Sequence, residues 1–368
     1  MKDIKQIVLT GGPCAGKTTA LVRIQEHFTN LGYKVFTVPE VPTLVTASGW
    51  SYLTPNHDFY YEGEKIILEL QLELENKMRH LAETCTEPCV IVCDRGALDI
   101  SAYISPEMYD ELCLSCGTSA HALLHGSRYD AVFHLVTAAD GAEQFYTTAN
   151  NASRYEQADE AGLRLARELD KKVIQAWTGH AHHRVIDNNR DFEHKIQRVL
   201  HEISSVLGLP QDIVEERKYI VELTDQLPDD CIETQILQTY LTAEPGSEVR
   251  LRRRTSGDHT VNIHTVRRQL SNSQELVTER QVPDALYESL LQQADPYRQP
   301  IRKLRHSFIH QGQFFELDTY QGQHEGLLIL ETKGIACHND LRLPPFLRIV
   351  QDITGDKRYY NPNLALRK

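Results

Sequence analysis

The sequence predicts an α/β domain, with a parallel sheet and flanking helices, followed by an antiparallel eight-stranded β-barrel. The run Gly11-Gly12-Pro13-Cys14-Ala15-Gly16-Lys17-Thr18 fits the P-loop pattern G-x-x-x-x-G-K-[ST] between a predicted strand and a predicted helix. Apolar strands alternate with helices in the first half of the chain, and short alternating strands fill the second half. We therefore expect two domains, residues 1–209 and 210–368.

The parallel sheet is predicted from five apolar segments, at residues 4–10, 34–38, 89–93, 131–136 and 184–186. Apolar side chains at helical spacing predict helices at residues 19–31, 62–81, 159–177 and 192–207. The last helix is followed by Gly208-Leu209-Pro210, a typical stop signal, which places the domain boundary there.

The β-rich second half is predicted from eight short segments with alternating side chains, at residues 214–223, 234–241, 249–255, 259–268, 276–281, 301–310, 313–320 and 326–333. Glycine-containing turns such as Ser256-Gly257-Asp258 suit antiparallel connections. Eight such strands could close a barrel.

Composition limits the classes of function. The 368 residues are 41% hydrophobic, which is enough for sizeable cores, and the formal net charge of −12 argues against general nucleic-acid binding. No leader or run of about 18 apolar residues is found, so we expect a cytoplasmic protein without a transmembrane segment. The eight cysteines do not suggest a disulfide framework, and we expect Cys113, Cys116, His121 and His125 to pack or face solvent in a helical segment rather than bind zinc.

The glycine-rich loop predicts a nucleotide site. Backbone N–H groups at the start of a helix bind phosphate, Lys17 reaches the β- and γ-phosphates, and the Thr18 hydroxyl binds Mg²⁺, or Mn²⁺ in its place. The nucleotide is ATP or GTP, with no base-reading motif to decide between them. The predicted binding residues are Gly11, Gly12, Pro13, Cys14, Ala15, Gly16, Lys17, Thr18 and Thr19.

Two carboxylates follow predicted strands, at the edge where open α/β sheets bind ligands. Asp94 ends an apolar strand and is expected to order Mg²⁺; a simple cap of the strand is the alternative. Glu40 could bind an acceptor hydroxyl, and a turn carboxylate is an equally good account. Asp187-Asn188 touches the base or caps a helix.

Charged residues two apart share one face of several predicted strands in the second half. Grouped basic residues repel one another unless a polyanion binds them, so we predict phosphate binding by Lys218, Arg250, Arg252, Arg254, Lys303 and Arg305. Carboxylates opposite, at Glu216, Glu316, Asp318 and Glu331, could hold Mg²⁺ or Mn²⁺. An exposed polar face over an apolar core is the alternative for any single pair.

The second half resembles the CYTH superfamily, the triphosphate tunnel metalloenzymes. The matching segments are Val214-Glu215-Glu216-Arg217-Lys218, Gln238-Thr239-Tyr240-Leu241, Arg250-Leu251-Arg252-Arg253-Arg254, Lys303-Leu304-Arg305 and Phe315-Glu316-Leu317-Asp318. The resemblance implies a β-barrel whose charged interior binds a triphosphate with metal ions. Val214 stands where the family has a glutamate, and Lys333 stands where it has a second carboxylate, so we favour a phosphate-binding domain over an efficient triphosphatase.

The first half resembles small P-loop kinases and their ATPase relatives, through the loop, the pair Asp94-Arg95 and Trp177-x-Gly179-His180. The resemblance implies that Arg95 faces a phosphate acceptor and that Arg154, in a lid-like segment, neutralises charge on the transferred phosphoryl group. Lys17, Asp94, Arg95 and Arg154 form the predicted catalytic set. For Arg164 and Arg167 we favour exposed ion pairs.

Together the two halves resemble a family that fuses a P-loop NTPase to a CYTH-like domain. We expect Mg²⁺-dependent hydrolysis of ATP or GTP, or phosphoryl transfer to a small acceptor, with a polyphosphorylated ligand in the tunnel. A nucleotide-regulated binding protein is the first alternative, and a metal-dependent triphosphatase in the tunnel is the second. The sequence leaves open the acceptor, the oligomeric state and any coupling between the domains.

Overall fold

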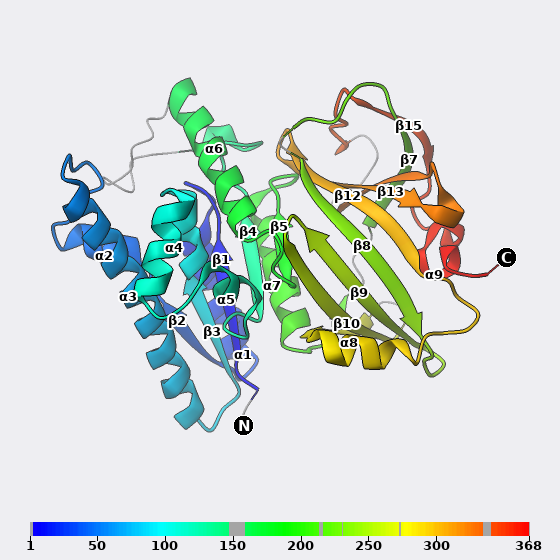
Figure 1. Ribbon diagram of the computed structural model, residues 1–368, viewed down its shortest axis with the longest axis horizontal. Coiled ribbons are helices and arrows are strands. Elements are labelled where there is room, and N and C mark those ends of the chain that lie inside the picture. The colour runs from blue at the N-terminus through cyan, green and yellow to red at the C-terminus, as the bar shows by residue number, and fades with distance from the viewer. Residues whose placement is uncertain are drawn as a thin grey trace. The chain divides into compact units, whose positions relative to one another are not determined.

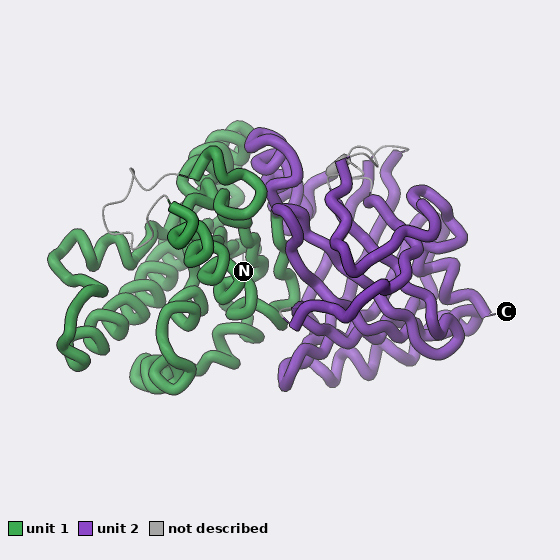
Figure 2. Tube along the Cα trace, turned by 90° about the horizontal axis from the view of Figure 1, so that it is seen from above, with its two compact units in different colours: residues 1–186 green, residues 187–368 purple. Residues whose placement is uncertain are grey.

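A computed structural model describes residues 3–146, 159–212, 216–229, 231–271, 274–333 and 340–367. The chain divides into two compact units, Met1–Ile186 and Asp187–Lys368 (Figure 2). Helix α7 (Phe192–Val206) therefore belongs to the second unit, and the boundary after residue 209 stays a prediction.

The first unit contains a five-stranded parallel sheet, as predicted. Its strands are β1 (Lys5–Thr10), β2 (Lys34–Val38), β3 (Cys89–Asp94), β4 (Ala131–Leu135) and β5 (His183–Ile186), in the order β2-β3-β1-β4-β5. All pairings are parallel, so the carboxyl ends of the strands meet at one edge. This edge carries the glycine-rich loop, which joins β1 to α1 (Lys17–Asn30) (Figure 1).

Helices flank this sheet because the strands are apolar on both faces; β3 and β4 are buried along their whole length. The helices are α1, α2 (Val41–Ala47), α3 (His57–Thr84), α4 (Pro106–Ser115), α5 (Ala120–His125) and α6 (Glu160–Ala176), with 3₁₀ turns η1 (Ala97–Ala102) and η2 (Glu143–Phe145). The expected packing of Cys113 is confirmed, since this residue of α4 lies in the main apolar core.

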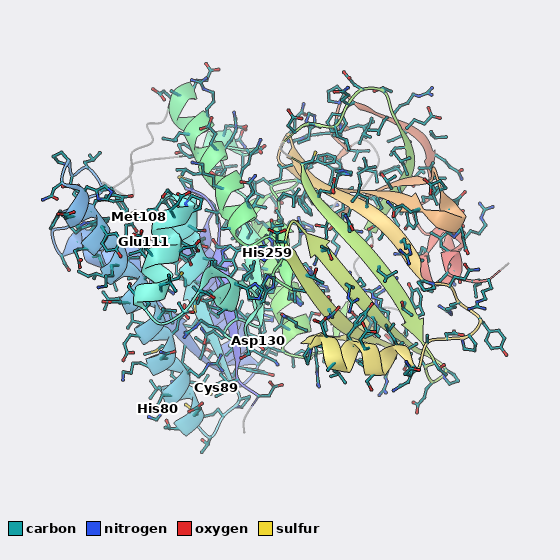
Figure 3. All side chains as sticks on the ribbon, viewed as in Figure 1. His80, Cys89, Met108, Glu111, Asp130 and His259 are labelled. Carbon is teal, nitrogen blue, oxygen red and sulfur yellow. The ribbon has the colours of Figure 1, made fainter. Side chains whose placement is uncertain are left out.

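The opposite edge of the sheet is held by a buried polar network. Glu75 of α3 accepts hydrogen bonds from Gln6 at 3.1 Å, from Tyr129 at 2.8 Å and from Arg128 at 2.9 Å. Figure 3 labels Cys89 and Asp130 at this edge, where β3 and β4 begin. Because Glu75 is fully buried and bonded on both oxygens, the network serves to fix α3 on the sheet.

The second unit is built on an antiparallel sheet of ten strands. They are β6 (Gln211–Asp212), β7 (Glu216–Leu223), β8 (Ile232–Leu241), β9 (Ser247–Ser256), β10 (His259–Gln269), β11 (Gln274–Val282), β12 (Ile301–His310), β13 (Gln313–Gln321), β14 (Leu328–Lys333) and β15 (Leu347–Asp352). The order is β15-β7-β14-β13-β12-β8-β9-β10-β11-β6. All eight predicted strands are present and the antiparallel architecture is confirmed.

The predicted number of strands in this unit, eight, is corrected to ten. The two added strands lie at the ends of the order, and within the described ranges β15 pairs with β7 alone and β6 with β11 alone. Both signals are weak in the sequence, because β6 has two residues and β15 is an edge strand whose pairing is interrupted by a bulge.

One face of this sheet is apolar and packed. Tyr219, Phe315, Leu317 and Leu330 form a core on that face, while α8 (Asp284–Leu291) contacts β8, β9 and β10. Since side chains alternate along a strand, the charged residues of β7, β9, β12, β13 and β14 at the predicted positions lie on the other face. Helix α9 (Asn361–Leu364) follows β15 near the end of the chain.

Among the residues that the structure describes, no helix is both long enough and apolar enough to cross a membrane.

Candidate functional site

The glycine-rich loop adopts a conformation that depends on its glycines. Gly11 and Gly16 have positive φ angles of 145° and 88°. A Cβ atom added to Gly11 would lie 2.1 Å from the Leu135 carbonyl oxygen, and one on Gly12 would lie 2.6 Å from Asp170 Oδ1. The loop is therefore packed directly against the end of β4 and against α6, which leaves no room for side chains at these positions.

The first turn of α1 is an open anion site. Gly16 caps the helix without a side-chain hydrogen bond, and the first turn contains no acidic residue. Unpaired N–H groups and the helix dipole at such an end attract negative charge. Thr18 and Thr19, in this turn, are exposed.

Lys17 lies folded over the loop. Its Nζ atom donates to the carbonyl oxygens of Gly11 at 3.0 Å and Gly12 at 3.3 Å. Partial burial and the neighbouring Arg95 guanidinium lower the pKa of Lys17, against the opposing effect of Glu40 and Asp94. Both contacts are to backbone carbonyls, and the ammonium has no close carboxylate partner among the described residues, so its charge is available to an anion.

Asp94 lies beside the loop because β3 pairs with β1. Register places it opposite Leu9, one residue before the end of β1. It is 8% exposed, and its Oδ1 atom is buried with no hydrogen-bond partner among the described residues. Burial raises the pKa of Asp94, and Glu40 and Asp99 add to this while Lys17 opposes it. A buried carboxylate oxygen without a partner, close to a phosphate loop, suits a bound cation.

Arg95 is clamped between two carboxylates. Its Nε atom donates to Glu40 Oε1 at 2.6 Å, and Nη1 lies 3.4 Å from Asp99 Oδ2. The residue has a φ angle of 73°, in the left-handed region that a side chain other than glycine rarely adopts. Burial alone would raise the pKa of Glu40, but Arg95 and Lys17 lower it to about 2. The structure thus brings Lys17, Glu40, Asp94 and Arg95 together at one edge of the sheet.

Sequence reasoning missed Asp99, which fixes this edge. Thr10 and Trp177 donate to its two oxygens at 2.6 Å and 2.5 Å, so Asp99 ties the end of β1 to the end of α6. The Trp177 ring is fully buried. No pattern in the sequence marks Asp99, since it lies in a short 3₁₀ turn after β3.

Asp170 of α6 was also missed, and it braces the loop. Its Oδ1 atom accepts from the backbone N–H of Gly12 at 2.6 Å and of Thr137 at 3.2 Å, and lies 3.0 Å from His134 Nε2. The Thr137 hydroxyl donates to the Pro13 carbonyl. Asp170 stands on the apolar stripe of α6 with Ala166, Val173 and Ile174, so a carboxylate on a buried face was the available signal.

Arg154, the fourth member of the predicted catalytic set, lies outside the described residues. Arg167 is paired with Glu143 at 3.1 Å and donates to the Ala139 carbonyl at 2.6 Å, in line with the ion pair that we favoured. Asp187 pairs with Arg198 of α7 and accepts from the Phe314 N–H at 2.8 Å.

In the second unit, strand register places the predicted charged residues on one face. Lys218 lies opposite Glu331, Glu331 opposite Glu316, Asp318 opposite Arg305, and Gln238 opposite both Ile301 and Arg252. We call this set the charged face: Glu216, Lys218, Arg250, Arg252, Arg254, Lys303, Arg305, Glu316, Asp318, Glu331 and Lys333. Its side chains are largely covered, with Lys303 and Asp318 at 3% and 0% exposed.

Much of the charged face is paired within itself. Lys218 lies 2.7 Å from Glu331, Arg305 lies 2.6 Å from Glu316 and 2.7 Å from Asp318, and Lys303 donates to Asp318. Hence the expectation that these cations stay together only through a polyanion is corrected for this part of the face, because carboxylates from neighbouring strands already neutralise them.

Two arginines of β9 pair with glutamates other than these carboxylates. Arg250 and Arg252 lie 3.5 Å and 3.3 Å from Glu248 and Glu279, distances at the outer range of an ion pair. The Nε atom of Arg250 is buried and has no hydrogen-bond partner among the described residues. Arg250 therefore offers a ligand an available donor on this face.

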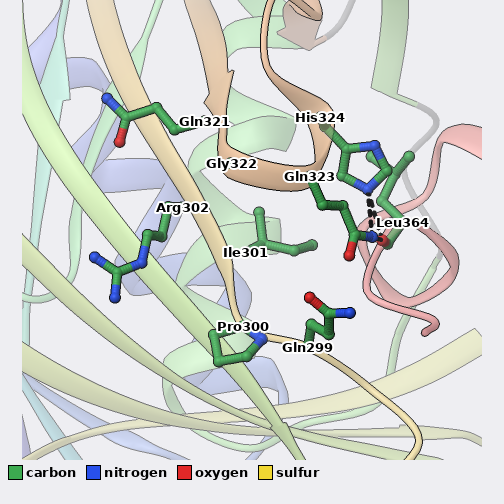
Figure 4. A pocket seen from close by; sticks show the side chains of 9 residues that line it. All are labelled: Gln299, Pro300, Ile301, Arg302, Gln321, Gly322, Gln323, His324 and Leu364. Carbon is green, nitrogen blue, oxygen red and sulfur yellow. Dashed lines mark hydrogen bonds between the residues drawn. The ribbon is translucent and has the colours of Figure 1, made fainter. Parts of the chain in front are cut away.

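A pocket of about 250 Å³ also lies in the second unit (Figure 4). Gln323 and His324 point their side chains at the Leu364 carbonyl oxygen, at 2.9 Å and 2.7 Å, and so hold the end of α9. The pocket contains none of the predicted site residues.

The parallel sheet with its glycine-rich loop defines an α/β domain of the P-loop class. The sequence model of a family described as AAA domain matches residues 6–195, and the chain belongs to this family. No curated protein matches the chain.

Among solved structures, the chain is similar to two of NE1496, one called a hypothetical protein and the other an inorganic triphosphatase, at 26% and 25% identity. These similarities cover 42% of this chain and 99% and 97% of the other, with TM-scores of 0.32 and 0.33. The PH1819 protein from Pyrococcus horikoshii is 15% identical over 35% of this chain and 81% of its own, with a TM-score of 0.26.

Proposed function

We propose that the AAA domain binds Mg²⁺ with ATP or GTP and either hydrolyses the nucleotide or transfers its γ-phosphoryl group to a small acceptor. One observation carries this proposal: two unsatisfied groups lie together at the loop. Lys17 has no close carboxylate partner among the described residues, and a buried oxygen of Asp94 has no hydrogen-bond partner among them. The first group suits phosphate and the second suits a cation, which are the two parts of a metal–nucleotide complex.

The residues at the loop fit Mg²⁺. Asp94 offers the buried oxygen and Thr18 an exposed hydroxyl at the start of α1, and hard oxygen ligands of this kind are what Mg²⁺ prefers. When bound, the ion would neutralise charge on the phosphate oxygens. Lys17 would bind and orient the phosphates, while Asp170 and Asp99 would hold the loop and sheet edge that position them.

Arg95 and Glu40 favour transfer to an acceptor over hydrolysis. A guanidinium held by two carboxylates is a rigid donor for a phosphate or hydroxyl of a second substrate. Glu40 is ionised at neutral pH and can accept a hydrogen bond from an acceptor hydroxyl. For Arg154, we retain the proposal that it neutralises charge on the transferred phosphoryl group.

For the charged face we propose binding of a polyphosphorylated small molecule, with Lys218, Arg250, Arg252, Arg254, Lys303 and Arg305 as the ligand-binding cations. If the loop binds nucleotide without turning it over, the chain would be a nucleotide-regulated binding protein. A metal-dependent triphosphatase on the charged face is disfavoured, because the carboxylates that would hold its metal ions, Glu216, Glu316, Asp318 and Glu331, are engaged with basic side chains.

The test is phosphate release from ATP, GTP and inorganic triphosphate with Mg²⁺, measured on the wild type, Lys17→Ala and Arg252→Ala. Lys172→Ala, at an exposed position of α6, is the matched control for loss of a lysine. Transfer is separated from hydrolysis by following γ-phosphoryl label into mixtures of small hydroxyl compounds.

We expect Lys17→Ala to lose at least about 100-fold in turnover, and Lys172→Ala and Arg252→Ala to retain it. If Arg252→Ala lost turnover while Lys17→Ala kept it, catalysis would lie on the charged face and the proposal would be refuted.

A further inference from the structure

Glu216 on the charged face is occupied by two lysines of this chain. Its Oε1 atom lies 3.3 Å from Lys333 Nζ, and its Oε2 atom lies 3.4 Å from Lys218 Nζ. Burial alone would raise the pKa of Glu216, but Lys333 and Lys218 lower it to about 2. The carboxylate is thus ionised at neutral pH, and each of its oxygens already has a cationic neighbour.

The same holds for the two most covered carboxylates. Glu331 contacts Lys218 through one oxygen at 2.7 Å and Arg305 through the other at 3.0 Å. Asp318 contacts Arg305 through Oδ1 at 2.7 Å and Lys303 through Oδ2. A metal ion would have to displace these side chains, which are at most 14% exposed, and would leave their charges covered and unpaired.

Charge balance leads to the same conclusion. The four carboxylates of this part of the charged face, Glu216, Glu316, Asp318 and Glu331, are matched by four cations, Lys218, Lys303, Arg305 and Lys333. A divalent ion binds where carboxylate charge is in excess, and no excess exists among these eight described residues. The metal ions that the CYTH resemblance implies therefore do not fit this face.

We infer that the charged face binds its polyanionic ligand without a divalent metal ion. The Lys333 and Lys218 ammonium groups take the place beside Glu216 that such an ion would otherwise occupy. This inference rests on the proposed binding of a polyphosphorylated ligand. The ligand is then bound directly by basic side chains, above all by Arg250 of β9, which lies 3.5 Å from Glu248 and whose buried Nε atom has no hydrogen-bond partner among the described residues.

The test is calorimetric titration of the full chain carrying Lys17→Ala with inorganic triphosphate, once in EDTA and once in excess Mg²⁺. The Lys17→Ala change keeps the probe from using the loop. Adding Arg252→Ala to the same chain shows whether the probe occupies the charged face. We expect binding in EDTA at least as tight as in Mg²⁺, because Mg²⁺ competes for the free triphosphate, and at least about tenfold weaker binding after Arg252→Ala.

A second variant tests the part of Lys333. In the same background, Lys333→Glu should weaken triphosphate binding in EDTA by at least about tenfold, and added Mn²⁺ should restore part of it, because the change creates an excess of carboxylate beside Glu216. Arg268→Glu makes the same charge change at an exposed position of β10, on the opposite face of the sheet, and should stay within about twofold of the parent.

The outcomes separate the inference from the proposal beneath it. Triphosphate binding that needs Mg²⁺ in the parent, and is lost with Arg252→Ala, would overturn metal-free binding but leave a polyanion site on the charged face. No binding under either condition, or binding that Arg252→Ala leaves unchanged, would overturn the proposed ligand site together with the inference.

Discussion

The loop of the AAA domain and the charged face of the second unit both collect charged side chains, but they differ in how far those charges are satisfied. At the loop, Lys17 contacts only carbonyl oxygens and Asp94 keeps a buried oxygen without a partner among the described residues. On the charged face, Asp318 and Glu331 are bonded through both oxygens.

The difference shows that the total number of charges in a site is a poorer guide to ligand binding than the charges that have no partner within the chain. An unpaired buried charge is costly, and a site that tolerates one is prepared for a ligand of the opposite sign. A self-neutral cluster has already met that need from within the chain, so a ligand there finds its clearest open donor at the Arg250 Nε atom, which has no hydrogen-bond partner among the described residues.

The largest effect is expected for Asp94→Asn, which removes the negative charge at the unsatisfied position. Turnover of nucleotide with Mg²⁺ should fall by about 10² to 10³, because charge stabilisation at the transferred phosphoryl group is lost. Asp110→Asn, at an exposed site in α4, is the control and should keep full activity. Equal turnover in both variants would contradict the claim that the unsatisfied Asp94 carboxylate binds the cation at the loop.

Asp170→Ala tests whether the loop depends on the carboxylate that braces it. The change leaves the Gly12 N–H, the Thr137 N–H and His134 without this acceptor, so the free energy of unfolding should fall by about 3 to 5 kcal/mol. Urea unfolding measures the loss. Asp170→Asn, which retains an oxygen acceptor, should lose less, and the exposed Glu168→Ala should be near the wild type. A wild-type-like Asp170→Ala would show that the loop holds itself.

Glu64 extends the comparison to a buried carboxyl group that has no basic partner among the described residues. It is 2% exposed, its Oε1 atom has no hydrogen-bond partner among the described residues, and burial raises its pKa from 4.5 to about 7, against the weaker opposing effect of Tyr60. Between these pH values the folded protein holds a proton that the unfolded chain loses, so stability falls as the pH rises through this window, by about 3 kcal/mol in all.

Glu64→Gln should abolish that fall, and the exposed Glu62→Gln should retain it. Urea unfolding at several pH values from 4 to 8 measures both slopes. A Glu64→Gln variant that loses stability with pH as steeply as the wild type would place the responsible proton elsewhere.

The smallest effect is expected for Arg348→Ala, which removes an ion pair with Glu222 at an exposed position. Both side chains are more than half exposed, so water screens the pair and its loss should change stability by less than about 1 kcal/mol. Thermal unfolding at low and high salt checks this value. A larger loss would mean that exposed ion pairs of this sheet contribute to stability as much as covered ones.

The strands and the loop could be predicted because their signals are local. Apolar segments gave all five parallel strands, and the glycine pattern gave the loop at its position between β1 and α1. The burial of Asp170 and Glu75 could also have been predicted, since each carboxylate lies on the apolar stripe of its helix.

Pairing on the charged face could not be read in the same way. Lys218 and Glu331 are 113 residues apart, and only the register of β7 against β14 brings them together. A one-residue slip would move either side chain to the apolar face. Asp99 was out of reach for a similar reason, because its partners Thr10 and Trp177 come from strand and helix ends far along the chain.

The most direct test of the account is a count of tightly bound Mn²⁺ per chain by electron paramagnetic resonance, in the presence of a non-hydrolysable nucleotide. The account predicts one ion, lost in Asp94→Ala and kept in Glu331→Gln, since the capacity to bind a metal lies at the loop and not on the charged face. A second ion that disappears in Glu331→Gln would contradict it.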